Sequence, residues 1–264
     1  TETVETIKFF DGCLKKYDID NYFNVLSDFK PDILIMEPSA RTIETDKELM
    51  LKIKTAFSTK LIVCGPIATA FPEEVSQWAD FVCIGEYEYS VLDIIKGKEK
   101  STISGVYPNS FRELLDINAL PFPEDDDVSR LDYAIPGEPN CEYIEIQAYA
   151  SRGCPLKCSF CVCGNLYYKK QNWRPRKIEN IIQEISYLKN KYPQMQGIFF
   201  DEEIHNGSKK FINELCAALI KNNLNTLKYN AMCCYYNLDE ETMHNLKAAA
   251  IINCVSALKL QAKK

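Results

Sequence analysis

Three closely spaced cysteines are the residues of this chain whose type and spacing best indicate chemistry. Cys154, Cys158 and Cys161 lie in the segment SRGCPLKCSFC, a Cys-x3-Cys-x2-Cys pattern with Phe160 before the last cysteine. Three thiolates within eight residues can bind three corners of an iron–sulfur cube and leave the fourth iron open. An open iron can bind a molecule other than the protein, so the spacing predicts a reactive cluster.

Zinc is the main competing interpretation of this loop. Structural zinc usually takes four ligands from two separated Cys or His pairs, and the loop holds one Cys-x2-Cys pair, Cys158 and Cys161. Cys163 is a conceivable fourth ligand, although four cysteines in ten residues crowd a tetrahedral site. A ferredoxin cluster needs a different spacing with a fourth cysteine. Free reactive thiols would leave the order of three cysteines after a strand unexplained.

The loop resembles the cluster loop of the radical SAM enzymes, and the resemblance extends over roughly residues 143–250. It implies that Cys154, Cys158 and Cys161 bind three irons of a four-iron, four-sulfur cluster whose fourth iron chelates S-adenosylmethionine (SAM). In such enzymes one electron splits a carbon–sulfur bond of SAM, and the resulting 5′-deoxyadenosyl radical abstracts a hydrogen atom from substrate. The protein positions the reactants and excludes side reactions, because the cofactor carries the chemistry.

The same resemblance implies further cofactor-binding residues. Phe160 occupies the aromatic position that usually packs by the adenine of SAM, although an ordinary core aromatic is the alternative. Asp201 and Glu202 stand where the family places a polar segment near the SAM amino group, and a carboxylate there can accept a charge-assisted hydrogen bond. Glu203 could replace either one. The alternative role of these carboxylates is to cap a turn before Gly207.

Two other groups of residues are candidates for contact with SAM or substrate. Arg174 or Arg176, in the segment WRPR, could meet the SAM carboxylate, although a surface role is the favoured interpretation. Cys233 and Cys234 end a predicted strand where radical SAM relatives often carry a basic residue. That departure leaves their contribution open.

Strand–helix units are predicted around the cysteine loop. A strand at 141–150 delivers the loop at its carboxyl end, and strands at 197–200 and 227–232 alternate with helices at 178–190, 209–220 and 239–249. Such units closing around a site at the strand ends are typical of a (β/α) barrel. About half of the units expected of a radical SAM core fit, and the tail Ile251–Lys264 does not match what should follow.

The first 96 residues alternate short apolar runs with helical patterns, which predicts a parallel sheet covered on both faces. Expected strands lie at 6–10, 33–36, 60–65 and 80–85, and expected helices at 21–29, 47–57, 72–78 and 90–96. Three loops occupy the carboxyl ends of strands, where ligands bind in such sheets: Glu37–Arg41, Gly65–Thr69 and Gly85–Glu86.

The order of these loops resembles the cobalamin-binding domain that precedes many radical SAM cores, over roughly residues 6–96. The resemblance implies cobalamin as a further cofactor. For Gly65 or Gly85 alone, a plain turn is the favoured interpretation. The domain holds no lower cobalt ligand of the histidine type, because the two histidines of the chain are His205 and His244. Many radical SAM relatives also lack that histidine.

The predicted fold class is therefore α/β, with a partial doubly wound parallel sheet of the cobalamin-binding kind followed by a partial radical SAM barrel. Residues 1–96 form the first domain, which lacks the first strand and helix of the resembled fold. Residues 97–140 form a linker rich in proline and charge, and 141–264 the N-terminal half of the core. The missing strand and the unmatched tail indicate a fragment truncated at both ends.

The composition indicates which binding partners are disfavoured and which cellular compartment is expected. A net charge of −6 and a pI near 5.2 argue against nucleic acid or an anionic membrane surface as the main partner. No apolar run approaches the roughly 20 residues that span a bilayer, and the N-terminus lacks a signal-peptide pattern, so the expected compartment is the cytoplasm. The twelve cysteines are then expected as thiols or metal ligands. Five lie in apolar stretches that predict small core residues: Cys13, Cys64, Cys83, Cys216 and Cys254.

These observations predict a radical SAM enzyme, either a cobalamin-dependent methyltransferase or an oxidative cyclase. It would act on a small-molecule substrate that the sequence does not identify, with a reductase, a flavodoxin or a ferredoxin as electron donor. The alternatives are a non-catalytic iron–sulfur or zinc-binding protein, in which the loop stores an electron or staples the fold, and an inactive fragment. An iron open to SAM would distinguish the first hypothesis.

Overall fold

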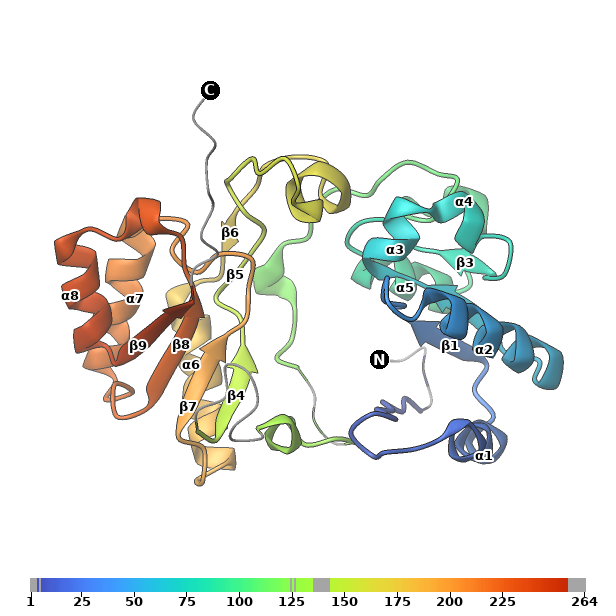
Figure 1. The fold of residues 1–264 in the computed structure, drawn as a ribbon, viewed down its shortest axis with the longest axis horizontal. Helices are drawn as coiled ribbons and strands as arrows, with labels where there is room; N and C mark the ends of the chain where they lie inside the picture. Colours follow the sequence, from blue (N-terminus) through green and yellow to red (C-terminus); the bar gives the residue numbers. More distant parts are fainter. Residues whose placement is uncertain (1–3, 5, 124, 126, 135–142, 256–264) are drawn as a thin grey trace. The chain divides into compact units, whose positions relative to one another are not determined.

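The computed structural model describes residues 4, 6–123, 125, 127–134 and 143–255 (Figure 1). The chain divides into two compact units, a first unit of residues 1–115 and 157–170 and a second unit of residues 116–156 and 171–264. The second half of the cysteine loop therefore belongs to the first unit, whereas the predicted domain boundary assigns the whole loop to the second. Each unit is described by itself.

The first unit is built on a parallel sheet in the order β1–β2–β3, formed by β1 (Ile33–Met36), β2 (Lys60–Val63) and β3 (Phe81–Val82). Successive side chains of β2 enter different cores. Leu61 and Val63 pack with α1 (Ile19–Phe29) and α2 (Ile43–Ala56), whereas Ile62 packs with α5 (Glu88–Ile95). Because side chains alternate across a strand, an apolar run such as 61–63 requires helices on both faces, as predicted.

Two expectations for the first unit are wrong. Residues 6–10 form no strand, and their apolar side chains Ile7 and Phe9 are 74% and 59% exposed. The segment Gly65–Thr69, expected as a loop, is helical: α3 spans Gly65–Ala70, with Pro66 at its start. Proline fits the first turn of a helix because its fixed φ and missing N–H cost nothing there. The short helix α4 (Pro72–Val75) follows directly.

The second unit holds a parallel sheet in the order β4–β7–β8–β9, with bounds Glu145–Ala148, Gly197–Phe200, Lys228–Met232 and Ile251–Val255. The intervening helices are α6 (Ile178–Lys191), α7 (Lys209–Lys221) and α8 (Glu240–Ala248). The start of the predicted strand, including Cys141, lies outside the described residues. Residues 251–255 of the tail, which the sequence did not match to the next part of a radical SAM core, add a fourth strand parallel to β8.

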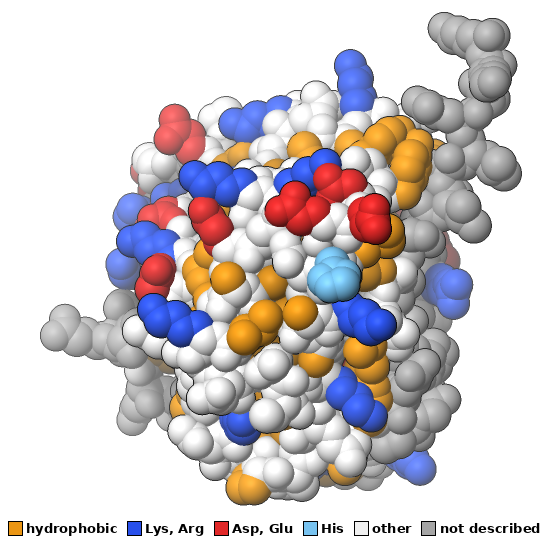
Figure 2. Space-filling model, turned by 90° about the vertical axis from the view of Figure 1, so that its left-hand side faces the viewer, with side chains coloured by type: hydrophobic (Ala, Val, Ile, Leu, Met, Phe, Trp, Pro, Cys, Tyr) orange, Lys and Arg blue, Asp and Glu red, His pale blue; other side chains and the backbone are white. Residues whose placement is uncertain are grey.

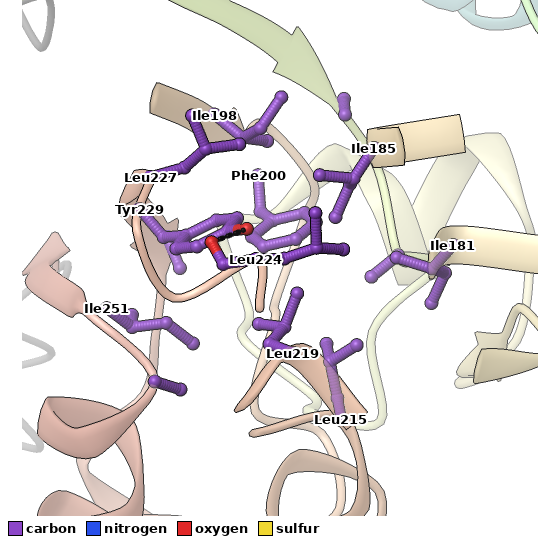
Figure 3. Close-up of a cluster of buried hydrophobic side chains, with 14 of the residues drawn as sticks. Ile181, Ile185, Ile198, Phe200, Leu215, Leu219, Leu224, Leu227, Tyr229 and Ile251 are labelled. Atoms are coloured by element: carbon purple, nitrogen blue, oxygen red, sulfur yellow. Dashed lines mark hydrogen bonds between the residues drawn. The ribbon is translucent and has the colours of Figure 1, made fainter. Parts of the chain in front are cut away.

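One face of this sheet packs against the helices to form the main core of the second unit, shown in Figure 3. Phe200 and Tyr229 stack at 5.8 Å between ring centroids, and the Tyr229 hydroxyl donates to the carbonyl of Leu224 at 3.0 Å. From α6, Ile181 and Ile185 are each 1% exposed in the same core. On the side that carries α8, acidic and basic side chains are interspersed, as expected of a solvated face (Figure 2).

The cysteine loop is closed at its base by a small antiparallel pair. Strand β5 (Ser151–Arg152) pairs with β6 (Arg174–Pro175), with Arg152 opposite Arg174. Within the loop, Cys163–Tyr167 forms a single π-helical turn, η4. The predicted linker contains short 3₁₀ turns in its described part, η1 (Lys100–Thr102), η2 (Ile117–Ala119) and η3 (Arg130–Tyr133), and a further turn, η5 (Tyr235–Asn237), follows β8.

The cysteines divide between core and surface. Cys64, Cys83 and Cys216 are buried as predicted, and burial raises the pKa of Cys83 and Cys216 to about 12. Cys13 and Cys254 are exposed, so the expectation that they are core residues is wrong. The cysteines in the described part of the chain form no disulfide. Across the same residues, no helix is both long enough and apolar enough to cross a membrane.

The strand at 251–255 can be tested with two neighbouring isoleucines. Ile251 is 4% exposed and faces the core, whereas Ile252 is 51% exposed. We expect Ile251→Ala to lower the free energy of unfolding by about 2–5 kcal/mol, because it leaves a cavity in the core. The matched control Ile252→Ala should change it by roughly 0.5 kcal/mol or less. Urea unfolding followed by circular dichroism measures both, and equal effects would contradict the assigned strand.

Candidate functional site

The three predicted ligands are partly exposed cysteines that form no disulfide. Cys154 belongs to the second unit, and its Sγ accepts a hydrogen bond from the Leu156 N–H at 3.5 Å. Cys158 and Cys161 belong to the first unit and form a tight turn, in which the Cys161 N–H donates to the Cys158 carbonyl at 3.1 Å.

Asn165 organises this turn, and sequence reasoning missed it. Its side-chain amide donates to the carbonyls of Cys158 and Cys161, each at 2.8 Å. An amide NH₂ group has two donors, so one asparagine can hold both ends of the turn. The available signal was an asparagine four residues after the last cysteine of the motif. The first-unit part of the cysteine loop is therefore ordered by the protein itself.

Within the described residues, no three His, Cys, Asp or Glu side chains are arranged as a metal site. Cys154 lies in the second unit and Cys158 and Cys161 in the first, so their assignment as one ligand set stays a prediction from the sequence. The donor chemistry fits an iron–sulfur cluster, which is held by thiolates. All three residues are outside disulfides and partly exposed.

The three carboxylates that follow β7 have different surroundings. Asp201 is exposed, and partial burial raises the pKa of its carboxyl above the ordinary value, with further increases from Glu202 and Glu203. Glu203 Oε2 accepts from the Gly153 N–H at 3.0 Å. Glu202 is 8% exposed, and both its oxygens bond inside the protein. Of the two carboxylates predicted to meet the SAM amino group, Asp201 is the one whose side chain is exposed to solvent.

Three other residues considered in the sequence, one aromatic and two arginines, also have defined surroundings. The Phe160 ring is 78% exposed, so it does not belong to a core. The favoured surface role for Arg176 is wrong, because this residue is 4% exposed and donates to Glu184 Oε2 at 2.6 Å and to the Tyr149 carbonyl at 2.7 Å. A buried guanidinium needs such partners to offset its desolvation. Arg174 is half-buried, with its Nε donating to Asn172 at 3.0 Å.

The segments that follow the carboxyl ends of β1, β2 and β3 contact one another. Gly65 and Gly85 have φ of +87° and +70°, where a side chain is strained, and a Cβ on Gly65 would lie 2.4 Å from Glu37 Cγ. The Thr69 hydroxyl donates to the Gly65 carbonyl and accepts from the Gly85 N–H, both at 2.9 Å. The Tyr87 hydroxyl donates to Glu37 at 3.0 Å. These glycines therefore do more than supply plain turns, because each backbone is bonded or closely approached from a neighbouring strand end.

The second half of the cysteine loop packs at this edge of the first unit. Helix α3 contacts η4. A Cβ on Gly85 would meet the Tyr167 carbonyl at 3.4 Å and the Phe111 ring at 3.1 Å. The strand ends predicted to bind a ligand thus adjoin the segment that carries Cys158 and Cys161, all within one unit.

No family model matches the chain. It is 25% identical over 228 residues to an uncharacterized methyltransferase of Pyrococcus horikoshii, covering 78% of this chain and 47% of that protein. It is 26% identical over 215 residues to the anaerobic magnesium-protoporphyrin IX monomethyl ester cyclase of Cereibacter sphaeroides, covering 75% and 34%. Its fold matches that of the radical SAM methyltransferase TsrM of Kitasatospora setae, determined with cobalamin and a [4Fe-4S] cluster bound. That match has a TM-score of 0.68 and 14% identity, over 94% of this chain and 53% of TsrM.

The chain is thus similar in sequence to a methyltransferase and a cyclase, and similar in fold to a radical SAM methyltransferase determined with cobalamin and a [4Fe-4S] cluster. The resemblance seen in the sequence and the predicted α/β fold class are confirmed. The chain spans under half the length of these two curated proteins.

The crowding of carboxylates after β7 predicts a pH-dependent effect of Asp201→Asn. A pKa raised in the folded state means that ionised Asp201 opposes folding, fully at pH values above its folded pKa and not at all well below its ordinary value of 3.8. We therefore expect the variant to melt at a higher temperature than wild type at pH 7, with the difference vanishing near pH 3.

Asp239→Asn is the control of opposite sign. Hydrogen bonds from Lys209 and from the side chain and backbone of Thr242 lower the pKa of Asp239. Removing the charge of Asp239 should therefore lower the melting temperature at pH 7. Thermal unfolding by circular dichroism at both pH values measures the two effects. A lower melting temperature for Asp201→Asn at pH 7 would contradict the crowding of charge at Asp201.

Proposed function

We propose that this chain is part of a radical SAM enzyme in which Cys154, Cys158 and Cys161 bind three irons of a four-iron, four-sulfur cluster. The observation that carries the proposal is the three-cysteine loop emerging from a parallel strand–helix unit whose fold matches a radical SAM methyltransferase. Parallel strand–helix folds place ligands at the carboxyl ends of their strands, and this loop follows the carboxyl end of β4.

When bound, the cluster and SAM would supply reductive cleavage of SAM to methionine and a 5′-deoxyadenosyl radical. The thiolates of this chain would hold the cluster, and Asn165 would keep the Cys158–Cys161 turn in shape. Asp201 would accept a hydrogen bond from the SAM ammonium, because its carboxylate is exposed and its pKa is raised by partial burial and two neighbouring carboxylates. The exposed ring of Phe160 would pack by the adenine.

The first unit would bind cobalamin at the carboxyl ends of β1, β2 and β3. This proposal is supported by the tightly bonded ends at Glu37, Gly65 and Gly85 and by the fold shared with TsrM, a protein determined with cobalamin bound. The reaction would be methylation or ring-forming oxidation, the two activities named among the relatives. Histidine cannot be the lower cobalt ligand from residues 1–96, because the chain has histidines only at 205 and 244.

The remaining partners follow from the chemistry. A reductase, a flavodoxin or a ferredoxin would deliver the electron, and a small molecule would be the substrate. A reducing compartment, the cytoplasm, would keep the thiols free. The domain division at 96/97 and 140/141 also remains a proposal.

Anaerobic reconstitution with iron and sulfide, followed by electron paramagnetic resonance of the reduced protein with and without SAM, tests the proposal. We expect a reduced cubane signal that shifts when SAM is added, because one iron is open. A signal indifferent to SAM would indicate an electron carrier, and a protein that holds only zinc would overturn the proposal.

Single cysteine variants sharpen this test. Cys158→Ala should abolish cluster assembly, because a cubane with two protein ligands is poorly held. Cys163→Ala is the matched control two residues beyond the motif, and it should retain the iron content of wild type. Loss of metal from both variants would favour a four-cysteine site, and full iron content in Cys158→Ala would contradict the ligand assignment.

A further inference from the structure

The base of the cysteine loop, defined as residues 150–153, is held by carboxylates from the neighbouring strand end. Glu202 Oε2 accepts from the Ala150 N–H at 3.1 Å, from the Ser151 N–H and from the Ser151 hydroxyl at 2.6 Å. Its other oxygen, Oε1, pairs with His205 Nδ1. One buried side chain thus engages two backbone donors and one side-chain donor of the loop base.

The burial of these groups makes the interaction strong. The Glu202 side chain is 1% exposed and the His205 side chain 0%. A carboxylate removed from water needs hydrogen-bond donors to offset its desolvation, and bonds to a charged acceptor are about twice as strong as neutral ones. Because the donors are backbone N–H groups at fixed positions, the bonds fix the path of the chain at 150–151.

Residues 172–176, which follow the cysteine loop, also contact the loop base. The Trp173 Nε1–H donates to the Ser151 hydroxyl oxygen at 3.0 Å and to the Ile204 carbonyl at 3.1 Å. The Arg176 N–H donates to the Ala150 carbonyl at 2.8 Å. Gly153 has φ of +87°, and a Cβ there would lie 2.2 Å from Asn172 Oδ1, so the backbone is closely enclosed before Cys154.

We propose that Glu202 is a positioning residue that fixes the loop base and so presents Cys154 in place before any cluster assembles. Glu203 extends this hold to Gly153. The part concerning the cluster rests on the proposed function. The assignment differs from a direct contact of Glu202 with SAM, because both oxygens of Glu202 already have partners inside the protein, whereas Asp201 is exposed.

Amide hydrogen exchange of the metal-free protein tests whether Glu202 holds the loop base. Glu202→Gln keeps the side-chain shape but removes the charge, and it leaves an NH₂ group facing donors. We expect the amides of Ala150 and Ser151 to exchange roughly 10- to 100-fold faster, the change that losing a hydrogen bond to a charged group produces. Ser151→Ala removes the hydroxyl and keeps both N–H groups, so it should give a smaller increase. Unchanged exchange in Glu202→Gln would overturn the inference.

Glu145→Gln is the matched control for loss of a buried charge in the same sheet. Glu145 is 5% exposed, begins β4 at the end away from the loop, and accepts from Asn230 Nδ2 at 2.7 Å. This variant should lower the melting temperature but leave the exchange of Ala150 and Ser151 unchanged. Faster exchange at both amides in Glu145→Gln would overturn the inference, because it would reflect general loosening of the sheet.

Iron and sulfide content after reconstitution tests the link to the cluster. Glu202→Gln should bind iron roughly 10- to 100-fold more weakly than wild type, the usual cost of losing a group that orients a metal ligand, whereas Glu145→Gln should bind it normally. Faster exchange with normal iron binding in Glu202→Gln would overturn the role in presenting Cys154. If wild type itself binds no cluster, the proposed function fails, and the exchange data still decide whether Glu202 holds the loop base.

Discussion

The parallel pairing of β4 with β7 is the constraint on which the candidate site depends. Ala148 stands opposite Phe200, and the Asp201 N–H donates to the Ala148 carbonyl at 2.9 Å. Because the two strands run in the same direction and end in register, the chain leaves both at one edge of the sheet. Residues 149–154 and 201–203 therefore emerge side by side, although about fifty residues separate them in the sequence.

That adjacency is what allows a carboxylate to be buried beside the loop base. Glu202 finds two backbone amides and a hydroxyl because Ala150 and Ser151 have just left the neighbouring strand. An antiparallel pairing would carry these groups to opposite ends of the sheet, and the same carboxylate would be buried without donors. The register of a few ladder hydrogen bonds thus decides whether the polar groups after the strands are satisfied.

Regular elements could be predicted from the sequence where periodicity is strong and local. The helix at 178–191 and the strands at 33–36 and 197–200 lie where apolar spacing indicated. The errors fall where tertiary context decides. Residues 6–10 have the pattern of a strand but expose Ile7 and Phe9, and a favoured surface arginine, Arg176, is buried against Glu184. Whether a charged side chain is buried depends on partners brought from elsewhere, which spacing along one segment does not encode.

The carboxylates at 201–203 show the same limit at the site. In the sequence, Asp201 and Glu202 are interchangeable neighbours, and family resemblance assigns them one role. In the folded chain, Glu202 points into the protein and Asp201 outward, because consecutive residues leaving a strand face opposite ways. Asn165 was missed for a related reason, since a side-chain amide that bonds nearby backbone carbonyls has no distinctive spacing.

This division of roles has an electrostatic consequence for the exposed carboxylate. Glu202 and Glu203 accept hydrogen bonds from backbone N–H groups of the loop base, and both also raise the pKa of Asp201. A negative group held at raised pKa beside two others is stabilised by any cation that approaches it, because the cation offsets both the desolvation and the repulsion. The ammonium of an amino-acid moiety is such a cation, and Asp201 is exposed to solvent. The fold thus places three carboxylates close together where a cationic ligand would reduce their mutual repulsion. Two of them, Glu202 and Glu203, are held by hydrogen bonds to the loop base.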